Sequence, residues 1–249
     1  MFVPIQLIFA LAMGAAMVFT SEAAVSSDGK FNLEVFGSFK QMSQNADASA
    51  TVRLESVSGK SGTYGVGALA GLRGEILIWD GRVLVSRGHD SGGRVEPAST
   101  SDEANLLIKA TVVEWAEVET PADMNQSAFE SFVRKEAQRR GLVDSMAYPY
   151  VVKGRFSRVL WHVVTGAAAV PAAGGGNVHA QGHARTRTLE HKDVDGAMVG
   201  FYSGDRFEGV ISHPDERFHV HFATAGLSAS GHVDEYAILK GSTLLLPLR

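Results

Sequence analysis

The chain of 249 residues contains no cysteine. Disulfide bonds, a cysteine nucleophile and a lipid-anchored cysteine are therefore excluded, and any bound metal must be held by His, Asp or Glu side chains. The chain also lacks an excess of either charge, since 23 Lys and Arg against 27 Asp and Glu leave a formal net charge of -4. Without a basic stripe or a polybasic patch, we expect no nucleic-acid or anionic-lipid partner, and instead a small-molecule substrate.

Several catalytic signatures are missing as well. No glycine-rich phosphate loop precedes a helical pattern, and no segment resembles the nucleophile elbow of serine hydrolases. What the chain has is 45% hydrophobic and 20% charged residues, the composition of a globular protein with a substantial core. We therefore look for functional residues among side chains that such a core can hold in position.

The N-terminal segment is the longest apolar run. Residues 2–19 are nearly all apolar and are followed by Ser-Glu-Ala-Ala at residues 21–24, which is typical of a secretory signal peptide and its cleavage site. We expect a signal peptide over residues 1–24, a single domain over residues 25–249, export to the periplasm or the extracellular space, and no membrane association once the signal is removed. An uncleaved membrane anchor is the alternative, because no Lys or Arg precedes the apolar run. The sequence leaves open whether the protein forms a homodimer.

A two-residue turn at Asp80-Gly81 joins two apolar segments, residues 75–79 and 82–86. Asp-Gly favours a type I′ β-hairpin because both positions need positive φ. The two-residue period of a strand places Glu75 on the same face as Leu77. A carboxylate on such a face lies either at a strand end in water or beside a partner such as a cation.

The pattern along the rest of the chain is one helix among many strands. Ser127 and Glu130 form a capping box that predicts the start of the helix, and Gly141 predicts its end. Residues 148–153 and 156–164 are expected to be two strands that turn near Gly154, and the Gly- and Ala-rich residues 166–184 a long loop. The sequence therefore predicts an α+β fold with largely antiparallel or mixed β-sheets in two fused halves and few helices.

Three histidines near the C-terminus are spaced for a metal site. His219 and His221 are separated by one residue, so on a strand both imidazoles project from one face. The small residues 224–230 favour a turn, after which His232 returns opposite His221, where directly paired Cβ atoms lie about 5 Å apart. Three imidazoles with an open fourth position suit a catalytic zinc ion or another divalent transition metal. Asp234, two residues beyond His232, is either a hydrogen-bond acceptor behind a ligand or a solvated residue.

Two segments of the chain resemble the alpha-acetolactate decarboxylase family. They are residues 64–75, Tyr-Gly-Val-Gly-Ala-Leu-Ala-Gly-Leu-Arg-Gly-Glu, running on into Asp80-Gly81, and the C-terminal stretch from Val-Gly-Phe at residues 199–201 through Gly-His-Val at residues 231–233. The resemblance implies an acetolactate decarboxylase-like fold, metal ligation by His219, His221 and His232, and a catalytic role for Glu75 beside the metal.

The chain departs from the family pattern at three places, one of which is the region around Trp161 and His162. The family carries a substrate-binding arginine on a strand where alignment on Gly154 places Val151, so Lys153 and Arg155, on the same strand face, become the candidate substrate-binding residues. The family also has a glutamate near the metal in its C-terminal tail, whereas no acidic residue follows Glu235 here.

Three functions follow as alternatives. The first is metal-dependent decarboxylation of 2-acetolactate to acetoin, with Glu75 as general acid and base. The second is metal-dependent ester hydrolysis, because the hairpin also resembles that of zinc-containing ester hydrolases of related fold. The third is a metal-binding or ligand-binding module of the same fold without catalysis, which Val151 favours.

Overall fold

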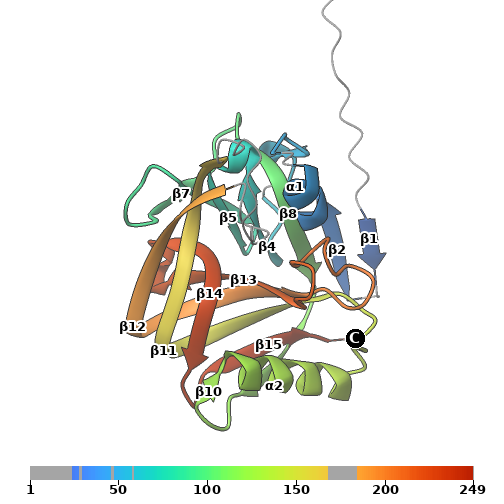
Figure 1. The fold of residues 1–249 in the computed structure, drawn as a ribbon. Helices are drawn as coiled ribbons and strands as arrows, with labels where there is room; N and C mark the ends of the chain where they lie inside the picture. Colours follow the sequence, from blue (N-terminus) through green and yellow to red (C-terminus); the bar gives the residue numbers. More distant parts are fainter. Residues whose placement is uncertain (1–23, 28–29, 46–47, 58, 168–183, 249) are drawn as a thin grey trace, which may run out of the picture.

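The computed structural model describes residues 24–27, 30–45, 48–57, 59–167 and 184–248 (Figure 1). The predicted signal peptide lies outside the described residues up to residue 23, and so does nearly all of the predicted loop over residues 166–184. Among the helices that the structure describes, none is long and apolar enough to cross a membrane.

Two antiparallel sheets form the body of the molecule (Figure 1). The first sheet has eight strands: seven run in the spatial order β1-β2-β8-β4-β5-β6-β7, and β3 pairs with β8. The strands are β1 (Ala24–Ser27), β2 (Phe31–Phe36), β3 (Val52–Arg53), β4 (Thr63–Leu69), β5 (Gly74–Trp79), β6 (Arg82–Arg87), β7 (Val95–Pro97) and β8 (Glu103–Val112).

The second sheet has seven strands in the spatial order β10-β14-β13-β12-β11-β15-β9, and an additional pairing of β14 with β11 closes the four strands β11 to β14 into a ring. The strands are β9 (Trp115–Glu119), β10 (Met124–Asn125), β11 (Tyr148–Ala167), β12 (Ala184–Tyr202), β13 (Phe218–Thr224), β14 (Ser230–Ile238) and β15 (Thr243–Pro247). The helical elements are α1 (Phe39–Asn45), α2 (Gln126–Arg139) and the short 3-10 turns Leu54–Val57, Ala70–Leu72 and Ala225–Leu227. The prediction of largely antiparallel sheets with few helices is confirmed, and the structure shows that there are two sheets.

Two local predictions need correction. The strands expected to turn near Gly154 are one continuous strand, β11, in which Gly154 pairs with Gly196. Glycine is required there by a close approach, because a Cβ atom would lie 2.2 Å from the Ser242 hydroxyl. The cap of α2 is Asn125, whose side chain accepts a hydrogen bond from the backbone N–H of Ala128, and not Ser127.

The main core lies between the two sheets. It joins residues of the first sheet, such as Val66 and Leu77, with large side chains of the second, such as Trp161 and Phe222. A smaller core covers the opposite face of the first sheet and includes Ile76. Strand β5 therefore alternates as predicted. The face that carries Leu77 also carries Glu75, so the carboxylate points towards the second sheet.

Candidate metal centre

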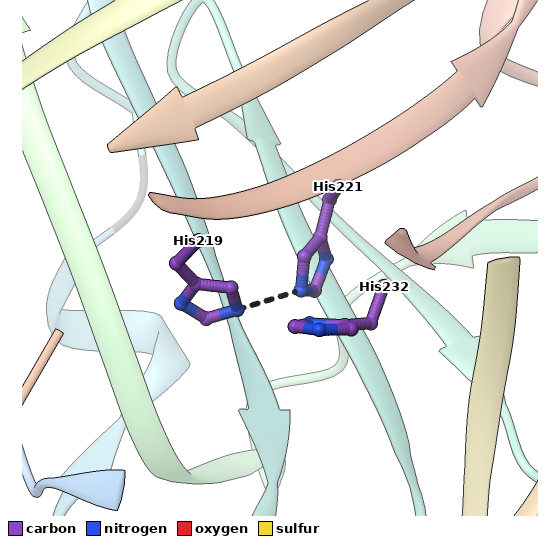
Figure 2. Close-up of side chains that lie close together, drawn as sticks. All are labelled: His219, His221 and His232. Carbon is purple, nitrogen blue, oxygen red and sulfur yellow. Dashed lines mark hydrogen bonds between the residues drawn. The ribbon is translucent and has the colours of Figure 1, made fainter. Parts of the chain in front are cut away.

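The hairpin β13–β14 carries all three predicted ligands. His221 pairs directly with His232, and the 3-10 turn Ala225–Leu227 connects the strands, with positive φ at Gly226 and Leu227. Small residues before Leu227 allow this tight turn, and its length sets the register of the two strands. Figure 2 shows the rings of His219, His221 and His232 facing one another.

The distances between the ring nitrogens fit a single metal ion. One nitrogen from each of the three rings lies within 4.8 Å of the others. Nε2 of His219 and Nε2 of His221 are 3.2 Å apart. Two nitrogens bound at about 2.0–2.1 Å to one tetrahedral zinc ion would be separated by about 3.3 Å, so His219 and His221 already have the spacing that such an ion requires.

The protonation states of the histidines also suit a metal. Burial lowers the pKa of His219, His221 and His232 well below the ordinary value, and neighbouring histidines lower each pKa further. Only a neutral imidazole offers a lone pair to a metal, so these rings are ready to bind without losing a proton. Nδ1 of His219 and Nδ1 of His221 are buried without a hydrogen bond of normal geometry, although the backbones of Ile211 and Ile76 lie close to the two rings.

Glu75 reaches the three histidines from the opposite sheet. Its Oε2 lies 3.7 Å from Nε2 of His221, and its Oε1 accepts a hydrogen bond of 3.1 Å from the backbone N–H of Val164 on β11. Glu75 is 4% exposed. Burial raises its pKa to about 7, against the opposing effects of His162 and the Val164 N–H. A carboxyl group with this pKa can both take and give a proton near neutral pH.

A second polar pair, His162 and Asp234, borders the same space. Nδ1 of His162 lies 2.8 Å from Oδ1 of Asp234, and the ring of His162 lies 5.0 Å from that of His232, centroid to centroid. Burial alone lowers the pKa of His162, but the bond to Asp234 and the charge of Glu75 outweigh it, so the pKa is raised. Asp234 thus forms its hydrogen bond with His162 and makes none to a predicted ligand. Sequence reasoning did not assign His162 to the site.

Two hollows adjoin the histidines. A small cavity of about 50 Å³ is lined by Glu75, His162, His219 and His232, and α1 closes one side with Phe39. The ring of Phe39 lies 4.9 Å from that of His219. A larger polar groove of about 460 Å³ runs along α2 and the β13–β14 hairpin and is also lined by His232.

The structure does not bring Lys153 and Arg155 into the cavity. Both side chains are exposed, and Nζ of Lys153 lies 5.6 Å from the ring centre of Trp79. Trp79 is four residues along β5 from Glu75, a distance of roughly 13 Å in a strand. Val151 is completely buried, in the row of paired residues that contains Val199 and His221. A substrate-binding role for Lys153 and Arg155 stays a prediction.

Comparison with known proteins identifies the family that the sequence resembles. The family model of alpha-acetolactate decarboxylase matches residues 40–246. The alpha-acetolactate decarboxylase of Streptococcus thermophilus is 26% identical over 182 residues, 72% of this chain and 70% of that protein. That of Lactococcus lactis subsp. cremoris is 23% identical over 183 residues, 74% of this chain and 71% of that protein.

Solved structures agree on the fold. The alpha-acetolactate decarboxylase of Bacillus subtilis strain 168 superposes with a TM-score of 0.67 at 18% identity, over 86% of this chain and 85% of that chain. A Staphylococcus aureus protein of unknown function, described as similar to alpha-acetolactate decarboxylase, gives a TM-score of 0.63 at 16% identity, over 86% and 84%. The two-sheet architecture is therefore shared with these proteins.

Proposed function

The chain belongs to the alpha-acetolactate decarboxylase family, and on that premise we propose that it converts 2-acetolactate to acetoin and carbon dioxide. The cofactor is a divalent transition metal, zinc in the first place, held by His219, His221 and His232. The observation that carries the proposal is the position of Glu75, a buried carboxylate that comes from the other sheet to within 3.7 Å of a ligand nitrogen.

The reaction needs a sink for charge and a source of a proton. A bound divalent metal would act as a Lewis acid towards the hydroxyl and carbonyl oxygens of the substrate and stabilise the negative charge that develops as carbon dioxide leaves. The bond between the carboxylate and its carbon breaks, and its electron pair ends in a new carbon–hydrogen bond. Each turnover therefore consumes one proton at that carbon.

Glu75 is placed to handle this proton. The Val164 N–H fixes Oε1, which leaves Oε2 directed towards the histidines. Because burial raises its pKa to about 7, Glu75 carries a proton in a substantial fraction of molecules at neutral pH. It can take the proton of the substrate hydroxyl and return it to carbon, and water then returns a proton to that oxygen, which accounts for the one proton that each turnover consumes. Phe39 lies against His219 at one side of the small cavity and shields that side of the site from water.

An assay of the purified, metal-loaded chain with 2-acetolactate tests the proposal. We expect acetoin to form, and its formation to stop when His221 is replaced by Ala. Absence of acetoin at full metal occupancy would reject the decarboxylase assignment. Turnover of simple esters that depends on His221 would then favour the hydrolase, and inactivity towards both substrates would favour a binding module.

A further inference from the structure

The substrate of the proposed reaction is an acid, and the cavity must accommodate its carboxylate. Most residues that line the cavity are apolar: Phe39, Met42, Gly67, Ala68, Leu72, Leu106 and Val164. A carboxylate that enters such a space without a hydrogen-bond donor incurs a large desolvation penalty. Glu75 makes the requirement stronger, because a second negative charge beside it is repelled. The cavity therefore needs a donor other than the metal ligands.

His162 has the geometry of that donor. It lies on β11 directly across from His232 on β14, so its ring shares the face of the ligands. Asp234 can only accept a hydrogen bond when ionised, so Nδ1 of His162 donates to it. Nε2 has no hydrogen-bond partner among the described residues. The ring is thus oriented by one carboxylate and has a free nitrogen on a residue that lines the cavity.

The remaining polar residues of the cavity are weaker candidates. Thr186 offers only a neutral hydroxyl on an exposed residue. The side chain of His213 packs against Phe39 with ring centroids 4.2 Å apart and, among the described residues, has no carboxylate that would orient it.

We propose that His162, oriented by Asp234, binds the carboxylate of the substrate through Nε2. The inference rests on the proposed function and deepens it by assigning the group that recognises an acid. In its protonated form the ring of His162 donates from both nitrogens, one to Asp234 and the other to the substrate carboxylate, and a charge-assisted hydrogen bond of this kind is strong and directional. His162 thereby orients the bond that breaks relative to the oxygens that the metal would hold, and the site selects acids over their esters and amides.

The test compares binding with turnover. The reduced substrate 2,3-dihydroxy-2-methylbutanoate keeps the two oxygens and the carboxylate but lacks the ketone, so it cannot lose carbon dioxide. Calorimetry measures its affinity and that of its uncharged amide for the zinc-loaded protein. We compare wild type with His162→Phe, which keeps a ring but removes both nitrogens, and with Asp234→Asn, which keeps the shape but removes the charge. His191→Phe is the matched control, because His191 stacks on Trp161 on the other face of the strand.

We expect the acid to bind wild type about 10- to 100-fold more tightly than the amide. His162→Phe should remove most of this preference, Asp234→Asn should reduce it, and His191→Phe should leave it unchanged. With 2-acetolactate, His162→Phe should raise KM by a similar factor and change kcat less. Zinc content and far-UV circular dichroism verify that the variants are loaded and folded, and Asp234→Asn answers the question if His162→Phe does not fold.

The two proposals fail in different ways. If wild type prefers the acid and His162→Phe does not, but no acetoin forms, the carboxylate site stands and the assigned reaction is wrong. If acetoin forms and the preference for the acid is the same in His162→Phe as in wild type, the role of His162 is overturned. A wild type without any preference for the acid overturns it as well.

Discussion

Replacement of Glu75 by Gln is expected to remove most of the activity and, in the metal-free protein, to raise stability at alkaline pH. The stability effect follows from the pKa of the carboxyl group, which burial raises from 4.5 to about 7. As pH rises between these values, the unfolded chain releases its proton before the folded chain does, so the free energy of unfolding falls. At about 1.4 kcal/mol for each pKa unit, the loss is about 3 kcal/mol and is complete above pH 7.

The glutamine side chain of this variant would have the same shape and could still accept the hydrogen bond from Val164, but it does not ionise. The metal-free variant should therefore equal wild type near pH 4 and exceed its stability by about 3 kcal/mol at pH 8. With metal and 2-acetolactate, loss of the acid and base group should lower kcat by about 10²- to 10⁴-fold.

Urea unfolding of the chelator-treated proteins, monitored by tryptophan fluorescence at several pH values from 4 to 8, measures the difference. Glu117→Gln is the matched control, because Glu117 is exposed on β9 and far from the cavity. Curves of stability against pH that run parallel for wild type and Glu75→Gln would refute the reasoning, since they would mean that Glu75 ionises as easily in the folded chain as in the unfolded one.

Two further changes test the proposed metal centre and the β5–β6 hairpin that carries Glu75. His221→Ala should weaken zinc binding by on the order of 100-fold or more, measured by competition with a chromophoric chelator. Zinc at 1,000 times Kd should raise the Tm of the wild type by about 10 °C, and His221→Ala should abolish this rise. An unchanged zinc affinity would exclude His221 as a ligand. Gly81→Ala should cost about 2 kcal/mol or more in urea unfolding, because Gly81 has a φ of +80° and a Cβ atom would lie 2.4 Å from the Lys60 carbonyl oxygen. Gly59→Ala separates the cost of positive φ from the cost of the close contact, since Gly59 has a φ of +90° but a Cβ atom there would meet nothing within 4 Å. An equal loss of stability in both variants would show that the contact contributes nothing.

The parts of the site that sequence reasoning predicted are those set by local rules. The Asp80-Gly81 turn has positive φ at both residues, as a type I′ hairpin requires, and so fixes the register of β5 and the face on which Glu75 lies. The pairing of His221 with His232 follows from strand period and a short turn. Both features involve residues close together in sequence, where turn chemistry leaves few alternatives.

The parts that it missed depend on distant pairing. His162 meets Asp234 only because β11 pairs with β14, 72 residues further along the chain, and no local pattern specifies that contact. The cap of α2 was misplaced for a similar reason. Asn125 and Ser127 are both good caps, but Asn125 pairs with Ala237 on β14 and is extended, so the helix begins directly after it.

The β13–β14 hairpin, which carries the three proposed ligands, is held in place from the opposite sheet. The hydroxyl of Ser86 on β6 donates a hydrogen bond of 2.7 Å to the Ser230 carbonyl, and the N–H of Ser230 donates one of 3.0 Å to the carbonyl of Gly93. Close by, the N–H of Val164 on β11 binds Glu75 on β5. Glu75, the proposed acid–base group, and the three proposed ligands come from different sheets, so links of this kind between the sheets fix the distance between them. A catalytic group misplaced by about 1 Å can lose about 100-fold in rate. Neither sheet alone could therefore hold the reaction geometry. We expect Ser86→Ala to lower kcat more than it lowers zinc affinity, because the substitution loosens the β13–β14 hairpin relative to Glu75 without altering any proposed ligand.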